Sequence, residues 1–381
     1  MENNNDNKVL NVPHLRFPEF TEEWRSHFLT DFMSFKNGMN PDAKRFGRGT
    51  KFISVMDIIN NQFICYDNIR ASVEVMDGDI DTYGVNYGDI LFQRSSETLE
   101  DVGQANVYLD SKPAIFGGFV IRGKSKGNYN PLFFRYLLAS PTARKRIIVK
   151  GAGAQHFNIG QDGLSKVSLD IPCMQEQKKI GELLQCIDAR IATQNKIIEK
   201  LQSLIKGLAV ALTTKEKANI AISQCLECHS STLQESEVLS SGLCKVFGAN
   251  GLVGYKDVPQ MNGDAILVIK DGSGVGTVSY AQGKFSVIGT LNYLTVIGNN
   301  DLRYLYFALS VFNFQPYKTG MAIPHIYFKD YGKAKIYCPS LAEQKRVANV
   351  LDKLESKLFV EQELLASFNQ QKLYLLGKMF I

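Results

Sequence analysis

The sequence predicts an α/β (α+β) protein in which two mixed domains are separated by two long antiparallel coiled-coil helices, with an internal pseudo-twofold repeat. Three observations support this prediction. The motif PCMQEQKKI at Pro172 returns as PSLAEQKRV at Pro339, 167 residues later (339 minus 172). Each copy of this PxxxEQK motif opens a run in which apolar residues alternate at steps of four and three. Each is also preceded by short apolar runs separated by Gly, Asn and Asp, which are typical of β-strands and turns.

Further repeated segments precede the two motifs in the same order. GDILFQR from Gly88 corresponds to GDAILVIK from Gly263, and NPLFFRYLLAS from Asn130 corresponds to NDLRYLYFALS from Asn300. GAGAQHFN, which begins at Gly151, likewise corresponds to TGMAIPHIYF. The separation changes between these pairs, as insertions in loops would cause. The chain is therefore expected to contain one structural plan twice.

Each half is expected to contain strands followed by one helix. KFISVMDI, AIFGGFVIRG and KFSVIGTLNYLTVIG are predicted as strands with turns. The helix of each half has Asn130 or Asn300 as its expected N-cap, with Pro131 or Asp301 at the first helical position. The predicted segments are a flexible N-terminal tail at 1–14, domain 1 at 15–170, spacer helix 1 at 171–213, a linker and domain 2 at 214–337, and spacer helix 2 at 338–381.

The two spacer helices carry matching apolar seams. The seam positions are Ile180, Leu184, Ile187, Ile191, Gln194, Ile198, Leu201, Ile205 and Leu208 in the first, and Val347, Leu351, Leu354, Leu358, Glu361, Leu365, Phe368, Lys372 and Leu375 in the second. Unbroken four–three alternation favours a coiled coil over an amphipathic helix lying on a domain. The helices should pair with each other over ~60 Å. The short linker TTKEKANIAIS favours an antiparallel arrangement.

Two features interrupt the seams. Gln194 and Glu361 are the midpoints, so an antiparallel pair would bring them face to face as a polar layer that sets the register. The alternative is that both point to solvent at a local bend. Lys372 spoils the last heptad, where a slip of one residue could turn Leu373 inward.

Composition limits the class of protein. The 381 residues suffice for two domains, and a net charge of +5 is compatible with a nucleic-acid partner without requiring one. The odd number of cysteines, seven, favours reduced thiols in a cytoplasmic protein. The polar start MENNNDNK does not resemble a signal peptide, and the sequence has no apolar run long enough for a membrane span. Cys225, Cys228 and His229 lack a second pair at zinc-site spacing, so no metal is expected.

Motifs of catalysis are also missing from the sequence. It has no phosphate-binding G-x-x-x-x-G-K-[ST] loop and no cluster of carboxylates with a lysine. GSGVGT from Gly272 lies between two predicted strands, which favours a turn over a dinucleotide site. NPLF from Asn130 lacks the second proline of an amino-methyltransferase motif, which favours a helix cap. The chain is predicted to be noncatalytic.

Basic, amide and hydroxyl side chains gather instead in turn-rich segments at corresponding places of the two halves. Such side chains contact phosphates and read base edges, although any one of them could equally lie in a solvated loop. The candidate DNA-binding residues are Lys44, Arg45, Arg48, Lys51, Gln93, Arg94, Ser95, Ser96, Gln155, His156, Asn158, Lys245, Asn250, Lys270, Ser273, Thr277, His325, Tyr327 and Lys329. Lys44, Arg45 and Arg48 are expected to contact phosphate. Together these residues suggest a protein that reads two separated DNA half-sites.

Several motifs give the chain a resemblance to a known family. LRFPEF from Leu15, the two PxxxEQK motifs, KVFGANGLVGY from Lys245 and the terminal GKMF resemble the specificity subunit of type I restriction-modification systems. The resemblance covers nearly the whole chain and implies two target-recognition domains, each reading half of a bipartite asymmetric sequence in double-stranded DNA.

The resemblance also implies partners. The spacer helices would dock two methyltransferase (modification) subunits, alongside restriction/translocase subunits. S-adenosylmethionine, ATP and Mg would belong to those partners, and this chain would hold no cofactor. Two alternatives stay open: a stand-alone bivalent DNA-binding protein, and a protein-interaction scaffold without a DNA role.

Overall fold

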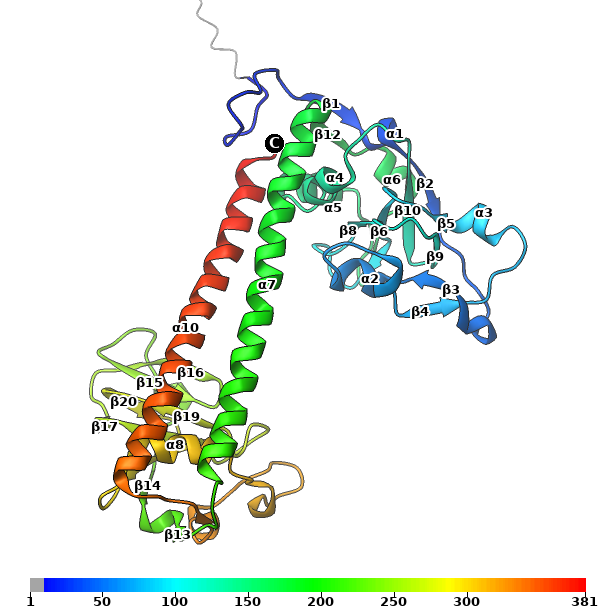
Figure 1. Ribbon diagram of the computed structural model, residues 1–381. Coiled ribbons are helices and arrows are strands. Elements are labelled where there is room, and N and C mark those ends of the chain that lie inside the picture. The colour runs from blue at the N-terminus through cyan, green and yellow to red at the C-terminus, as the bar shows by residue number, and fades with distance from the viewer. Residues whose placement is uncertain (1–9) are drawn as a thin grey trace, which may run out of the picture. The chain divides into compact units, whose positions relative to one another are not determined.

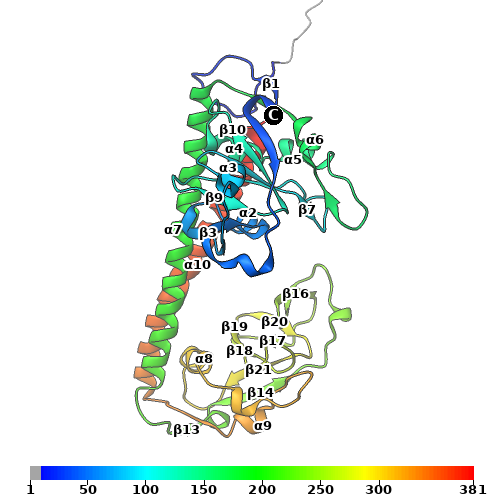
Figure 2. The same cartoon turned by 90° about the vertical axis from the view of Figure 1, so that its right-hand side faces the viewer.

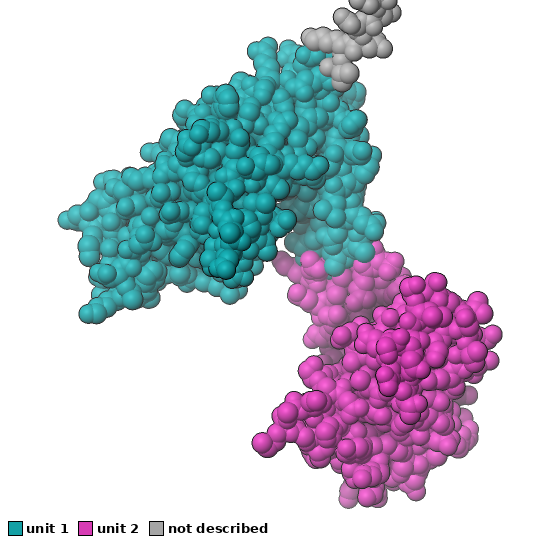
Figure 3. Space-filling view, turned by 180° about the vertical axis from the view of Figure 1, so that it is seen from behind, with its two compact units in different colours: residues 1–194, 364–381 teal, residues 195–363 magenta. Residues whose placement is uncertain are grey.

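The computed structural model describes residues 10–381, which form two compact units (Figure 3). Unit 1 contains the described residues up to Gln194 together with Leu364–Ile381, and unit 2 is the continuous segment Asn195–Glu363. Residues 1–9 of the expected flexible tail lie outside the described residues. Two long helices, α7 (Met174–Thr213) and α10 (Leu341–Lys378), each contribute a segment to both units.

Unit 1 contains two four-stranded sheets, two smaller pairs and several short helices (Figure 1). The first sheet has the order β2 (Met33–Asn37), β10 (Val120–Ser125), β6 (Ile90–Gln93), β8 (Ala105–Val107), and the second β4 (Ala71–Val73), β3 (Phe46–Ile53), β9 (Ala114–Phe116), β5 (Gly84–Val85). The pairs are β1 (Arg25–Phe28) with β12 (Ser168–Ile171) and β7 (Ser95–Ser96) with β11 (Phe157–Asn158). The helices are α1 (Leu29–Phe32), α2 (Val55–Asn60), α3 (Asp79–Tyr83), α4 (Pro131–Leu137), α5 (Pro141–Ile148) and α6 (Gln161–Ser165).

Unit 2 repeats this plan with fewer helices (Figure 2). Its first sheet has the order β14 (Leu226–Ser230), β21 (Leu291–Val296), β18 (Ala265–Ile269), β19 (Val278–Ala281), and its second β16 (Gly251–Lys256), β15 (Cys244–Gly248), β20 (Lys284–Val287), β17 (Met261–Asn262). A short pair joins β13 (Ile220–Ala221) to β22 (Lys335–Ile336), and the helices are α8 (Leu302–Ser310) and α9 (Phe328–Tyr331).

The internal repeat predicted from the sequence is confirmed strand by strand. The four-stranded sheets of the two units have the same strand order, and the corresponding strands follow each other along the chain in the same sequence. In each unit all pairs within these sheets are antiparallel except one, which is β3 with β9 in unit 1 and β15 with β20 in unit 2. The loop between β18 and β19, with GSGVGT, is therefore a turn between strands, as predicted.

The predicted N-cap is confirmed for the helix of the first half and is wrong by one residue for the helix of the second half. The side chain of Asn130 caps α4 by accepting the N–H of Phe133 at 2.9 Å, as expected. In α8 the cap is Asp301, which accepts the N–H of Tyr304 at 2.9 Å, so the predicted cap at Asn300 is wrong by one residue. Asn and Asp cap helices about equally well, and local sequence could not choose between the two neighbours.

The structure explains why the PxxxEQK motif occurs twice. Gln177 is buried; its Oε1 accepts the N–H of Asn130 at 2.9 Å, and its Nε2 donates to the carbonyl of Pro172 at 3.0 Å. Gln344 makes the same pair of bonds, to the N–H of Asp301 at 2.8 Å and the carbonyl of Pro339 at 2.9 Å. One buried amide in each unit thus joins the start of a long helix to the capped end of α4 or α8.

The glutamate of the motif has a different role in each unit. In unit 1 Glu176 is fully buried and accepts two 2.7 Å bonds from the guanidinium of Arg16, within the LRFPEF segment. The same segment donates the N–H of Leu15 to the carbonyl of Lys378 at 2.9 Å. In unit 2 Glu343 pairs on the surface with Arg346, one turn further along the helix. LRFPEF therefore fastens the beginning of α7 to the end of α10.

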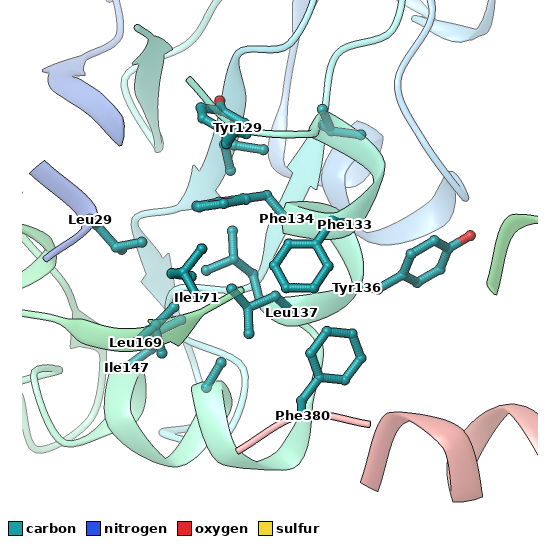
Figure 4. Packing of buried hydrophobic residues seen from close by; sticks show 14 of the residues in the cluster. Leu29, Tyr129, Phe133, Phe134, Tyr136, Leu137, Ile147, Leu169, Ile171 and Phe380 are labelled. Carbon is teal, nitrogen blue, oxygen red and sulfur yellow. The ribbon is translucent and has the colours of Figure 1, made fainter. Parts of the chain in front are cut away.

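The predicted seams are buried against two kinds of neighbour. Every seam position in both helices is buried or half-buried, which confirms the seams, and Asp188, Ala209 and Ala348 beside them are buried as well. In unit 1 Ile180 and Leu184 share one core with α4 and with Leu375 and Phe380 of the C-terminal segment. Figure 4 shows Phe380 in this core beside Phe133 of α4. In unit 2 a segment of α7 shares a core in the same way with α8 and the first turns of α10. Within each unit the two helical segments run in opposite directions, and each also lies on a domain, so the coiled coil and the domain-bound amphipathic helix coexist.

The register does not slip at Lys372. Leu373 is exposed, which contradicts the predicted inward turn, and Lys372 stays in the seam because its Nζ lies 2.6 Å from the Oδ1 of buried Asp188. The other oxygen of Asp188 accepts the hydroxyl of Tyr136 at 2.8 Å. Burial and the neighbouring Asp188 both raise the pKa of Tyr136, so the phenol remains a donor.

Unit 2 has a related contact between its domain and α10. The guanidinium of Arg303 donates to Asp352 at 2.6 Å and to Glu355 at 2.7 Å, and the hydroxyl of Tyr306 donates to Glu355 at 2.8 Å. Glu355 corresponds to Asp188 by the 167-residue offset of the motif. In both units a tyrosine and a cation therefore bind a carboxylate at the same place on the long helix.

Gln194 and Glu361, the predicted polar layer, are both buried. Glu361 forms an ion pair with Lys357, one turn earlier in α10. Their burial excludes the alternative in which both point to solvent. A role in setting register stays a prediction. Among residues 10–381 the helices are all too short or too polar to cross a membrane.

Candidate nucleic-acid interface

Two candidate segments of unit 1 that are distant in sequence are brought together. Strand β7, which contains Ser95 and Ser96, pairs with β11, which contains Asn158, and the hydroxyl of Ser95 donates to the Oδ1 of Asn158. The carbonyl of Arg94 accepts the N–H of Ile159 at 2.9 Å. The predicted contacts at 93–96 and 155–158 therefore form one site.

Unit 2 builds the same site with the same backbone bonds. The carbonyl of Lys270 accepts the N–H of Ile326 at 2.9 Å, so Lys270 stands where Arg94 stands in unit 1. Asp271 pairs with His325 as an isolated bridge. The candidate residues of 270–277 and 325–329 thus also form one site.

A short hairpin projects from each site. In unit 1 Ala152 and Asn158 exchange both backbone bonds, at 2.9 and 2.8 Å, and in unit 2 Thr319 and His325 do so at 2.9 and 2.8 Å. The five residues enclosed are here called tip 1 (153–157, GAQHF) and tip 2 (320–324, GMAIP).

Both tips begin with a glycine that the geometry requires. Gly153 has φ +143° and Gly320 has φ +87°, and a Cβ would lie 2.0 Å from the carbonyl oxygen of His156 or 2.3 Å from that of Ile323. No L side chain fits there, because such distances are far inside van der Waals contact. The two tips are therefore equivalent, with Gln155 and His156 in the positions of Ala322 and Ile323.

Candidate residues differ in how freely their side chains can reach a ligand. Gln155, His156, Asn158, Ser273, Thr277, Tyr327 and Lys329 are exposed. In unit 2 the ring centroids of Tyr327 and His325 are 5.7 Å apart. The Nζ of Lys329 lies 5.2 Å from the ring centroid of Tyr327. Gln93, in contrast, is buried with its Nε2 bound to the carbonyl of Ser95, and Arg94 donates to the carbonyl of Gly118 at 3.2 Å. These two side chains support the strand end and its neighbouring turn.

The basic segment 44–51 precedes and enters β3, in the second sheet of unit 1. Arg45 donates to the carbonyl of Glu74 and pairs with Asp79, and Lys51 donates to the carbonyl of Ile69 at 2.7 Å. Lys44 is exposed, and Arg48 is 70% exposed in a surface pair with Glu74. The side chains of Lys44 and Arg48 are thus accessible to a phosphate ligand. Those of Arg45 and Lys51 are already bonded to residues that flank β4.

In unit 2 the residues of KVFGANG lie on the corresponding sheet. Asn250 is exposed in the turn between β15 and β16. Lys245 lines a cavity of about 840 Å³ whose other walls include Arg303, Asp352 and Glu355. Lys245 itself is exposed, and Arg303 already pairs with both carboxylates of this cavity.

The cysteines and the histidine of the C-x-x-C-H segment are packed within the fold of unit 2. No group of three His, Cys, Asp or Glu side chains in residues 10–381 is placed to hold a metal ion. Cys225 is packed in the core, and burial raises the pKa of the Cys228 thiol to about 11. His229 stacks on Tyr293 and bonds to the Oγ1 of Thr295 at 2.9 Å, so it serves the pairing of β14 with β21.

The fold defines a class of protein with two repeated domains, each packed on segments of two long helices. A family model described as the type I restriction modification DNA specificity domain matches residues 21–203 and 229–370. This is more than half of the chain, and the chain belongs to that family.

Relatives and solved structures agree with this membership. A putative type I restriction enzyme MjaX specificity subunit of Methanocaldococcus jannaschii is 27% identical over 213 residues, 55% of this chain and 49% of the relative. The type I restriction enzyme EcoKI specificity subunit of Escherichia coli K12 is 22% identical over 212 residues, 52% and 45% of the two chains. The chain thus spans about half the length of these curated relatives.

The structural likeness extends over nearly the whole chain. The crystal structure of a type I restriction-modification system S subunit from M. genitalium has a TM-score of 0.65 at 17% identity, covering 97% of this chain and 99% of that one. A structure from work on complex assembly and conformational transition of the type I R-M system has a TM-score of 0.58 at 13% identity, covering 96% and 98%. At these identities the likeness concerns the fold.

Proposed function

We propose that this chain is the noncatalytic DNA-sequence-recognition subunit of a type I restriction-modification complex. Each unit would read one half of a bipartite, asymmetric target in double-stranded DNA. The single observation that carries the proposal is the pair of equivalent hairpin sites, anchored by identical backbone bonds at Arg94 and Lys270. The side chains around them differ, as the reading of two different half-sites would require.

Catalysis would belong to partner proteins. Two methyltransferase subunits would supply methylation with S-adenosylmethionine, and restriction/translocase subunits would supply ATP- and Mg-dependent cleavage. Exposed apolar side chains on the long helices of unit 2, Ile197 and Leu204 on α7 and Phe359 and Val360 on α10, support docking of such partners. A genomic DNA target implies a cytoplasmic location.

The test is methylation-aware sequencing of the host genome with and without this gene. We expect methylation to disappear at one bipartite motif. Exchange of residues 15–170 for the corresponding domain of a relative should then change one half of that motif and leave the other intact. If both halves changed together, the units would not be independent readers.

Binding of the purified chain to duplex DNA distinguishes the two alternatives. A stand-alone DNA-binding protein would bind its site tightly without partners, and deletion of the gene would leave genomic methylation unchanged. A protein scaffold without a DNA role would show no dependence of duplex affinity on salt, whereas neutralised phosphates make that affinity fall as salt rises.

A further inference from the structure

Tip 2 presents apolar side chains to solvent. Met321 is fully exposed and Ile323 is 64% exposed, whereas the equivalent positions of tip 1 are Ala154 and His156, which flank the exposed amide of Gln155. Single exposed apolar residues are common on protein surfaces. Two of them on a five-residue projection beside a candidate DNA site are a more specific observation.

Folding of unit 2 does not need these two side chains. The hairpin is held by the backbone bonds between Thr319 and His325 and by the N–H of Gly272, which donates to the carbonyl of Pro324 at 2.9 Å. Its core contact is made by Ile326, which is buried. Met321 and Ile323 are thus available for a ligand.

The surroundings of tip 2 fit a polyanion. Lys318 precedes the tip, Lys270 provides the carbonyl that anchors it, and Lys329 follows beside Tyr327. Asp271 and Asp330 also lie in these segments, so the positive charge is moderate. Apolar side chains flanked by lysines are suited to base edges between phosphates.

We propose that Met321 and Ile323 determine the specificity of unit 2 by apolar contact with the 5-methyl groups of thymine in the major groove. The major groove admits a two-stranded β-ribbon, and thymine is the base whose edge there carries a methyl group. Tip 1 reads through hydrogen bonds instead, with the amide of Gln155 and the imidazole of His156. This inference rests on the proposed DNA-reading function and names the base chemistry of one half-site.

The test is selection from a pool of random-sequence duplexes by the full chain in complex with its modification subunits, followed by sequencing. For the variant M321A/I323A we expect the preference for A·T pairs to fade in one half-site, with roughly tenfold weaker binding of the parent's selected duplex, as for one lost base contact. The slope of affinity against salt should not change, because no charge is removed. The matched variant Q155A/H156A should alter only the other half-site.

Two further arms isolate the contact with the thymine methyl group from a general loss of apolar surface at tip 2. Replacing thymine by uracil in the selected duplex should weaken binding of the parent and have no further effect on M321A/I323A. The tip exchange M321A/A322Q/I323H, which copies residues 154–156, should bring the tip 1 preference into both half-sites. It also keeps the test valid if the double alanine variant folds poorly.

The outcomes are distinguishable. If the parent enriches no sequence, the proposed function fails and this inference fails with it. If the parent enriches a bipartite site but M321A/I323A selects the same site, the inference alone is overturned. Full binding of the uracil duplex by the parent would also overturn it, and would favour an apolar wedge between bases.

Discussion

The strongest test of the repeated design is removal of the amide of Gln177. In Gln177→Ala the N–H of Asn130 and the carbonyl of Pro172 lose their partner in a buried place. Each unsatisfied buried group costs about 1–3 kcal/mol, so the loss of both bonds should cost unit 1 roughly 2–6 kcal/mol. With a urea dependence of about 2 kcal/mol per M, the unfolding midpoint should fall by roughly 1–3 M.

The chain contains its own reporter for this experiment. Trp24 is the single tryptophan, it is buried in unit 1, and its ring lies 6.0 Å from that of Phe133 on α4. Tryptophan fluorescence in urea therefore follows unit 1. Gln175→Ala is the matched control, because Gln175 lies on the same helical turn and is exposed. An unchanged midpoint in Gln177→Ala, or an equal fall in Gln175→Ala, would refute the reasoning.

The variant Gln177→Glu adds a dependence on pH. Its carboxyl can replace the amide only when protonated, because only then can it donate to the carbonyl of Pro172. Burial should raise its folded pKa above the unfolded value of about 4.3. The variant should thus approach the parent's stability below that unfolded pKa and lose stability as pH rises through the raised folded pKa. A constant difference between variant and parent from acid to neutral pH would contradict this account.

Four other predictions follow from the contacts. Lys372→Leu would complete an apolar seam, yet it should destabilise unit 1 by about 3 kcal/mol because it leaves buried Asp188 without its cation; a stabilised variant, by Trp24 fluorescence, would contradict this. Arg48→Ala should reduce the slope of log affinity against log salt by about one without lowering the melting temperature, whereas Arg45→Ala should lower the melting temperature; equal effects of both on stability would refute the distinction. One heptad inserted after both Ile198 and Leu365 should lengthen the stretch of DNA tolerated between the two half-sites, and an unchanged stretch would exclude the idea that the long helices set that distance. Replacing Gln194 and Glu361 together by Leu should raise thermal stability and loosen register, as seen by disulfide trapping between cysteines engineered along the helices; the same trapped pairs at the same stability would show that the layer does not set register.

Local patterns in the sequence are sufficient to predict the repeat and the seams, because both are periodic and each residue is judged against near neighbours. In the sequence Lys372 reads as an interruption of the apolar seam. Its partner Asp188 is distant along the chain, so their ion pair is visible only in the folded protein. Arg45 and Lys51 are grouped with the exposed cations for the same reason, since Asp79 and the carbonyl of Ile69 are remote acceptors.

The tips illustrate a different limit of sequence reasoning. Gln155 and His156 are found from the sequence because polar residues in turns suggest contacts. Met321 and Ile323 are missed because apolar residues suggest a core, and only the folded hairpin shows them outside it. Gly320 and Pro324, which enclose them, are the available signal, because glycine and proline mark turns and loops.

The division of the chain has a consequence for its synthesis. Unit 2 is one continuous segment, so all residues of its hydrophobic core are translated before the last residues that unit 1 needs. Unit 1 needs Leu375, Met379 and Phe380, which fill its core beside Trp24 and Phe133 and are translated after all of unit 2. The hydrophobic core of unit 1 therefore stays incomplete until residues 375–380 leave the ribosome. Until then its apolar side chains are accessible to chaperones and proteases. Nonsense mutations near codon 375 should consequently damage the amino-terminal half, which red-shifted Trp24 emission in a chain truncated after residue 374 would reveal.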